Sequence, residues 1–351
     1  MTTTRKVKLQ DVAHHAGVSA ATVSRAIARP ELVSPETLAR IRASAAQLGY
    51  VPDGAARALA SGKSMAIGAV VPTLDSAVFS HALQSMQTTL SRQGYQLLIA
   101  SHDYNSAAEA EAIRTLLTRG VDGLILVGAQ RADSTWDLLR TSGVPIAVTW
   151  CSTDRFHSVV VDNERAGQIA AQHLIDLGHK RIGAVIGARQ FNDRQAARLA
   201  GMQRALRKAG LDLPDSRVTE QPLTLAGGRT GCARMLALDD PPSAVIGGID
   251  ILAIGCIIEA QSRNIVVPTA LSVVGIDDIE MSGHIFPPLT SVHLPVGQIG
   301  ETAARSLLEQ IAGQKERNTI DLPIELVSRK STARLSAAHR HKDGEKKSAR
   351  N

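Results

Sequence analysis

The 351-residue sequence has few cysteines, few aromatic residues and no long apolar run. Its three cysteines, Cys151, Cys232 and Cys256, are scattered and form no CxxC pair, which argues against a zinc site and fits a reducing compartment. No stretch of about 18 apolar residues occurs, as a membrane-spanning helix would need. The basic start MTTTRKVKLQ has no apolar segment behind it, unlike a secretory signal. We therefore expect a cytoplasmic protein without a membrane partner.

Sequence motifs of common enzyme classes are missing as well. The segment GAVIG at 183–187 does not complete a GxGxxG loop, and there is no Walker lysine motif and no HExxH pair. Ser152 and Ser158 lack the setting of a nucleophile elbow. We expect no catalytic residues, no cofactor and no metal ion. What remains is a chain with 44% hydrophobic and 21% charged residues, long enough for two or three compact units.

Charge is unevenly distributed along the chain. Residues 1–64 carry a net charge of +5 and residues 329–351 carry +6, whereas residues 65–328 carry −5. A basic head on an acidic body favours a head that meets a polyanion such as DNA. A basic end that only faces solvent gives the same count, so charge alone leaves both interpretations open.

The first fifty residues have the pattern of three short helices. Apolar residues at helical spacing from Leu9 to Ala16 are followed by Gly17, and Ser19 is suited to cap a second helix over about 20–28. Ser34 begins a third apolar-striped helix that runs to about residue 48. Small residues at the first turn allow a steep crossing, as a helix-turn-helix requires. A generic three-helix bundle with a solvated face is the alternative.

The second helix of a helix-turn-helix lies in the major groove of DNA, with its first residues against the base edges. Arg25 is a planar cation with several donors, suited to guanine or phosphate. Thr22 and Ser24 suit phosphate contacts or weak base contacts. Ala20 and Ala21 can make only apolar contacts, for example with a thymine methyl group.

Residues 52–64 fit a hinge helix better than a unit that folds alone. The segment GAARALASGKS is short and poor in large apolar residues. It makes sense as a helix that orders on DNA, where Leu59 enters a minor-groove step and Arg57 and Lys63 meet phosphates.

The motif V-x-x-x-DVA-x-x-AGVS-x-x-TVSR…LGY-x-P…A-x-x-L, running from Val7 to Leu59, resembles the head of the LacI/GalR family of bacterial transcriptional regulators. The resemblance implies that Ala20 and Ala21 are the specificity pair and that Leu59 intercalates. The full set of DNA-contacting positions it implies is Ala20, Ala21, Thr22, Ser24, Arg25, Ala56, Arg57 and Leu59.

From residue 65 onward, apolar runs alternate with helix-patterned segments. Runs such as AIGAVVP, GLILVG, RIGAVIG and LSVVGID are typical of parallel strands in sheets covered on both faces. About 260 residues of this pattern exceed one ordinary core, so we expect two α/β lobes. The family resemblance extends over this stretch through VVVDNERAG, HLIDLGHKRIGAVIG, ARLAGMQRAL, LSVVGIDD and PPLTSV. It implies two Rossmann-like lobes of the periplasmic-binding-protein type with a small molecule between them.

The expected division is a helix-turn-helix head at 1–51, a hinge at 52–64, a two-lobed effector and dimerisation domain at 65–328, and a basic disordered tail at 331–351. The N-lobe would take about 65–160 plus 293–322, and the C-lobe about 161–292 plus 323–330. The tail has one leucine and no heptad repeat, so we expect a homodimer formed through the body rather than a tetramer.

Ligands of open α/β sheets bind beyond the carboxyl ends of the strands. The candidate effector contacts in such loops are Phe79, Trp150, Arg194, Arg198, Ile249, Asp250 and Asp277. The resemblance implies that Arg198 is a cleft cation and that Asp277 contacts the ligand. Phe79 and Trp150 are alternatively core residues, and Asp250 alternatively caps the helix that follows it.

The side chains at two cleft positions bear on the effector's chemistry. Ile249 stands where sugar-binding relatives usually have asparagine, and Trp150 stands where many members have a polar residue. Both disfavour an unmodified neutral sugar, so we expect a small acid or a polyol derivative, within the wider class of sugars, sugar acids and related small acids.

Together these features predict a sequence-specific repressor of a carbohydrate or small-acid catabolic operon. A homodimer would bind pseudo-palindromic double-stranded DNA, and an effector would either release or tighten it. Two alternatives stay open: a two-lobed binding protein, and a sugar-metabolising α/β enzyme without a role in gene regulation.

Overall fold

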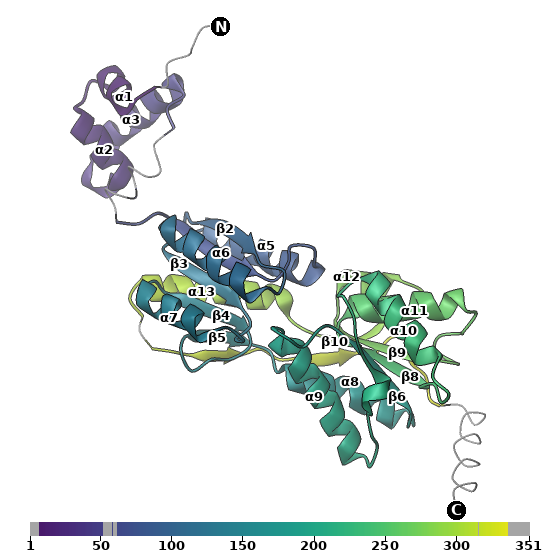
Figure 1. Cartoon of the computed structure of the whole chain (residues 1–351). Coiled ribbons are helices and arrows are strands. Elements are labelled where there is room, and N and C mark those ends of the chain that lie inside the picture. Colours follow the sequence, from purple (N-terminus) through teal and green to yellow (C-terminus); the bar gives the residue numbers. More distant parts are fainter. Residues whose placement is uncertain (1–6, 52–57, 59–61, 315, 336–351) are drawn as a thin grey trace, which may run out of the picture.

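The computed structural model describes residues 7–51, 58, 62–314 and 316–335. It contains a small helical head and a larger body built from two α/β lobes (Figure 1). The predicted hinge contacts Ala56, Arg57 and Leu59 lie outside the described residues. No helix in the described part of the chain is both long and apolar enough to cross a bilayer.

The head contains three α-helices and one short 3-10 turn. Their bounds are α1 (Leu9–Ala16), α2 (Ala20–Ala28), η1 (Pro30–Leu32) and α3 (Pro35–Leu48). Gly17 ends α1 in the left-handed region at φ 62°, where a side chain is disfavoured. The hydroxyl of Ser19 then accepts the amide of Thr22 at 3.1 Å and caps α2. Val12, Val23 and Ile41 form the buried centre of the head, so the predicted helices and their stripes are confirmed.

The N-lobe is a six-stranded sheet with strand order β11-β5-β4-β3-β1-β2. Every pairing in it is parallel. The strands are β1 (Ala66–Val71), β2 (Gln96–Ser101), β3 (Gly123–Val127), β4 (Ile146–Trp150), β5 (His157–Val160) and β11 (Thr319–Asp321). The helices are α5 (Ala77–Ser91), α6 (Ser106–Thr118), α7 (Asp133–Ser142) and α13 (Val296–Ile311).

The C-lobe repeats this plan with strand order β12-β10-β9-β8-β6-β7, in which only β12 is antiparallel to its neighbour. The strands are β6 (Ile182–Ile186), β7 (Val218–Glu220), β8 (Ala244–Gly247), β9 (Ser272–Asp277), β10 (Thr290–His293) and β12 (Glu325–Val327). The helical elements are α8 (Asn163–Asp176), α9 (Asp193–Lys208), η2 (Asp215–Arg217), α10 (Leu225–Leu236), α11 (Asp250–Ser262) and α12 (Glu280–His284).

The chain passes between the lobes three times: after β5, after β10 and after β11. One continuous apolar core extends from one lobe to the other and includes Val161 and Leu294 at two of these crossings. The carboxyl ends of both sheets face the space between the lobes, which is where the predicted loops meet (Figure 1).

The last described residues belong to the C-lobe. Ser331 is fully buried. Its backbone carbonyl accepts the backbone N–H of Val273, and its hydroxyl donates to the backbone carbonyl of Val273. Leu335 is buried and its amide donates to the carbonyl of Leu177. The prediction of a disordered tail from residue 331 was therefore wrong for residues 331–335, because Ser331 and Leu335 are buried and hydrogen-bonded to the C-lobe.

Candidate functional site

Two surfaces of the molecule collect the predicted site residues: the exposed side of α2 and the cleft between the lobes. On α2, Val23 and Ala26 face the core of the head, whereas Ala20, Ala21 and Arg25 are exposed. Because positions four apart share a helix face, α2 presents two methyl groups near its start and a guanidinium one turn further on. This is the surface that a recognition helix turns toward DNA.

Thr22 and Ser24, the hydroxyl residues of α2, are half-buried. The Thr22 hydroxyl lies 2.8 Å from the hydroxyl of Ser19, so it takes part in the helix cap. A phosphate bound by the Thr22 hydroxyl would have to compete with the Ser19 hydroxyl for it.

The cleft between the lobes holds a cavity of about 40 Å³. Six of the seven predicted effector residues line it: Phe79, Trp150, Arg194, Arg198, Ile249 and Asp277. Ser76, Val78, Tyr104, Asn192, Gln195 and Leu223 complete its wall. A second cavity of about 100 Å³ shares Tyr104, Ile249 and Asp277 with it and extends the cleft toward the start of α5.

An aromatic pair forms the N-lobe wall of the cleft. The rings of Phe79 and Trp150 meet edge to face, with centroids 5.4 Å apart and an angle of 75° between planes. Trp150 has a positive φ of 66° at the end of β4, which is uncommon for a bulky residue. Its backbone carbonyl accepts a hydrogen bond from the side-chain Nδ2 of Asn163 at 3.0 Å. The two side chains belong to the N-lobe core and to the cavity wall at once.

Arg198 is the central cation of the cleft. Its Nε donates to Asn163 Oδ1 at 3.0 Å, Nη1 donates to the carbonyl of Gly248 at 2.7 Å, and Nη2 lies 3.1 Å from Asp277 Oδ1. Both terminal nitrogens are therefore engaged by groups of the C-lobe, one by a carbonyl and one by a carboxylate. The guanidinium is thus held in one orientation before any ligand arrives.

Asp277 ends β9 with a φ of 122°, a conformation unusual outside glycine. Burial raises the pKa of Asp277 to about 7, with nearby Asp250 adding to the shift and Arg198 opposing it. The carboxyl group therefore titrates in the neutral range.

Asp250 lies behind the cleft rather than in it. It is fully buried, and its two carboxylate oxygens accept from the hydroxyls of Ser282 and Ser291 and from the amide of Ile279. It opens α11 without capping it through its side chain, and it is absent from the cavity wall. The side-chain cap that the sequence suggested is therefore absent, and Asp250 lines neither of the two cavities.

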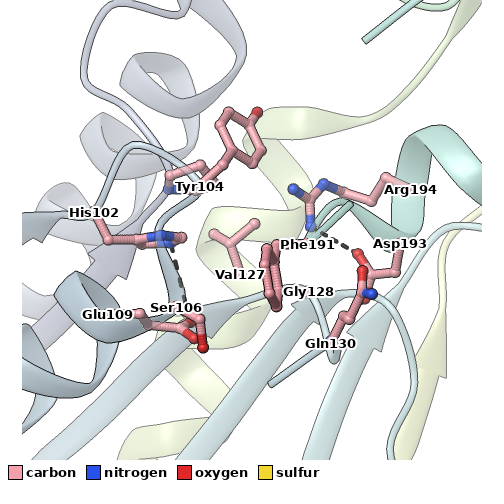
Figure 2. Close-up of a pocket in the computed structure, with 11 residues that line it drawn as sticks. His102, Tyr104, Ser106, Glu109, Val127, Gly128, Gln130, Phe191, Asp193 and Arg194 are labelled. Atoms are coloured by element: carbon pink, nitrogen blue, oxygen red, sulfur yellow. Dashed lines mark hydrogen bonds and ion pairs between the residues drawn. The ribbon is translucent and has the colours of Figure 1, made fainter. Parts of the chain in front are cut away.

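A contact between the lobes adjoins the cavity. Asp193, from the C-lobe helix α9, accepts the backbone amides of Ala129 and Gln130 in the N-lobe at 2.5 and 3.1 Å. The same carboxylate pairs with Arg194 at 2.9 Å, as Figure 2 shows. Arg194 lines the cavity together with Tyr104 of the N-lobe. Arg194, which lines the cavity, is therefore bonded to a residue that bridges the two lobes.

Comparison with known proteins places these surfaces in a family. Residues 8–53 match the model for bacterial regulatory proteins of the lacI family, and residues 171–332 match the periplasmic binding protein-like domain. The chain is 36% identical over 334 residues to the HTH-type transcriptional regulator GntR of Pseudomonas aeruginosa, covering 94% of this chain and 97% of that one. The chain belongs to the LacI family.

Solved LacI-family structures share the fold. The lac repressor dimer bound to operator and the anti-inducer ONPF matches with a TM-score of 0.83 and 27% identity, covering 94% of this chain and all of that one. The CelR–cellobiose complex matches with a TM-score of 0.70 and 28% identity, covering 93% and 99%. The predicted family and two-lobed fold are confirmed, and the chain is a DNA-binding transcriptional regulator with an effector-binding domain rather than an enzyme.

Some residues of the LacI-family cleft escaped the sequence analysis. Tyr104 follows the carboxyl end of β2, so the strand-end rule that selected Trp150 also applied to it. Asn163 lies in the VVVDNERAG segment and orients Arg198. Asp193 precedes a chosen arginine, but its bonds to Ala129 and Gln130 join segments about 64 residues apart, and no local pattern shows that.

Proposed function

We propose that this LacI-family regulator is a homodimeric repressor of a carbohydrate or small-acid catabolic operon, and that its effector is a small acid bearing hydroxyl groups. The lac repressor relative binds its operator as a dimer, and the CelR relative binds cellobiose. The two-lobed cleft and the helical head of this chain supply the corresponding surfaces. The DNA contacts would be those of α2 together with Ala56, Arg57 and Leu59.

The observation that supports an acidic effector is that two arginines line the cavity of about 40 Å³. Arg194 and Arg198 both line it, and a guanidinium binds a carboxylate through parallel N–H donors. Asp277 balances one of these charges only while it is ionised, and its pKa of about 7 lets it become neutral beside an anion. Phe79 and Trp150 offer an apolar wall to the carbon chain.

The residue at the start of α11 supports the same assignment. Ile249 lines the cavity with an aliphatic side chain and provides no hydrogen bond to a sugar ring. A pocket with two guanidinium groups and an isoleucine at this edge discriminates for an anionic group and against a neutral pyranose. Phe79, Trp150, Arg194, Arg198, Ile249 and Asp277 would contact this ligand.

Calorimetry on the full-length chain tests the effector class. D-gluconate, D-glucose and benzoate are titrated separately, and gluconate is expected to bind most tightly. Arg198→Lys keeps the charge but removes the planar donor fork, so it should weaken gluconate binding by about tenfold or more. Arg204→Lys, on the exposed part of the same helix, is the control and should leave binding unchanged. Tight binding of glucose alone would contradict the proposal.

Gel shifts on the DNA upstream of the gene that encodes this chain test the regulatory role. The full-length protein should prefer a segment of this DNA to random competitor, and gluconate should change that preference. A dimer that shows no preference for any duplex, with or without the ligands, would overturn the repressor assignment.

A further inference from the structure

A third, smaller cavity lies beside the effector cleft, at the carboxyl ends of β2 and β3 and the start of α6 (Figure 2). Its volume is about 10 Å³, room for a single water molecule or one small polar group. The residues that line it include His102, Tyr104, Ser106, Gln130 and Arg194. None of the predicted site residues except Arg194 belongs to it.

His102 is the unusual group in this small cavity. The side chain is nine-tenths buried, yet neither ring nitrogen has a hydrogen-bond partner among the described residues. Glu109 Oε1 lies 4.0 Å from its Nε2, beyond hydrogen-bond distance. A buried imidazole without partners is costly unless a bound molecule satisfies it.

The charges around His102 are already compensated within the protein. Arg131 donates to Glu109 at 2.9 Å and to the carbonyls of Gly128 and Val127. Arg194 pairs with Asp193. On the side of this cavity, Arg131 and Arg194 each already face a carboxylate, so a neutral polar group fits there without disturbing either ion pair.

The ring of His102 is neutral at physiological pH. Burial, together with the positive charges of Arg131 and Arg194, lowers the pKa of His102 to about 4. A neutral imidazole offers one N–H donor and one nitrogen acceptor. With the hydroxyl of Ser106 beside it, this combination matches an alcohol group, which both donates and accepts.

The small cavity and the effector cleft adjoin, and some of the same residues line both. Tyr104 and Arg194 line both spaces, and Phe191, Asp193 and Arg194 reach the small cavity from the C-lobe. His102, Ser106 and Gln130 come from the N-lobe. Separation of the lobes would join the two spaces, and their closure would enclose whatever group had entered.

We propose that His102 and Ser106 form a hydroxyl-binding subsite that receives the far end of an extended polyhydroxylated acid whose carboxylate lies at Arg194 and Arg198. This inference rests on the proposed acid effector and adds a requirement for chain length and for a hydroxyl group distant from the acid. A shorter hydroxy acid would fill the arginine end and leave the subsite unoccupied.

A chain-length series on the full-length protein tests the subsite. Calorimetry is run with the aldonates glycerate, threonate and gluconate, which share the acid group and differ in the number of hydroxyl-bearing carbons. In the wild-type chain, affinity should rise with length. In His102→Leu, which keeps the bulk and removes both nitrogens, gluconate should bind about tenfold more weakly or worse while glycerate is unaffected.

Two further variants separate recognition from folding. His102→Asn retains a donor and an acceptor and should keep gluconate affinity within about threefold of wild type, and Ser106→Ala should show a partial loss. His284→Leu, at an exposed histidine of α12, is the matched control and should not alter the series.

Equal gluconate affinity in wild type and His102→Leu overturns the subsite and leaves the effector class intact. Failure of every aldonate to bind the wild-type chain overturns both.

Discussion

The guanidinium of Arg198 and the carboxylate of Asp277 lie 3.1 Å apart, both almost fully buried, at the point where α9 and the end of β9 meet the cleft. A buried ion pair whose acid titrates near neutrality can change its charge when an anion arrives. The charge balance of this cavity therefore depends on whether Asp277 is protonated.

Effector affinity should depend on pH through Asp277. Below its pKa of about 7 the carboxyl group is neutral, so the positive charge of Arg198 is left for an anionic ligand. Gluconate should bind more tightly at pH 6 than at pH 8, by about three- to tenfold. Calorimetry in both buffers measures this, and Asp277→Asn should remove the difference. Affinity that instead rises with pH would contradict this role for Asp277.

The contact between the lobes at Asp193 should set how readily they separate. Asp193→Ala removes the acceptor of the Ala129 and Gln130 amides, so the ligand-free body should expand. Small-angle scattering should report a larger radius of gyration than for wild type. Asp176→Asn, an exposed carboxylate on α8, is the matched control. An unchanged radius in Asp193→Ala would show that the core shared by the lobes holds them without this contact.

The crossing of α8 and α9 depends on glycine. A Cβ on Gly167 would lie 1.9 Å from the carbonyl oxygen of Arg198, well inside contact distance. Gly167→Ala should lower the free energy of unfolding by about 2–4 kcal/mol and displace Arg198, with weaker gluconate binding. Gly283→Ala, where the nearest atom would be 3.9 Å away, is the control. Thermal denaturation of the two variants provides the comparison, and equal midpoints would show that the helices can separate at little cost.

Arg25 should contribute specificity as well as affinity for DNA. Arg25→Ala should weaken binding to the preferred upstream duplex by about 1–3 kcal/mol. Fluorescence anisotropy with the preferred duplex and with random duplexes measures the specific and the non-specific affinity. Arg42→Ala, exposed on α3, serves as a charge-matched control. If both variants lose only non-specific affinity, Arg25 contacts phosphate and does not distinguish bases.

The sequence predicted most of the secondary structure because its signals are local. Gly17, Ser19 and Ser34 mark helix ends through bonds that span three or four residues, and the continuous apolar runs correspond to buried parallel strands. The strand-end rule also brought six of seven effector candidates to one cavity.

What the sequence could not predict depends on distant partners. Asp250 follows a strand as the rule requires, yet Ser282 and Ser291 hold its carboxylate 32 and 41 residues away, behind the cleft. The unpartnered state of His102 likewise follows from how α6 and the β3 loop pack around it, and no pattern near residue 102 encodes that.

The packing of residues 331–335 affects where this protein can be shortened. Ser331 and Ala333 bond to the backbone and side chain of β9 residues, and Leu335 bonds to the end of α8. Removing the basic segment just after Lys330 would strip hydrogen bonds from the strand that ends in Asp277. A shortened protein meant for crystallisation should therefore retain Leu335, and a purification tag belongs beyond it.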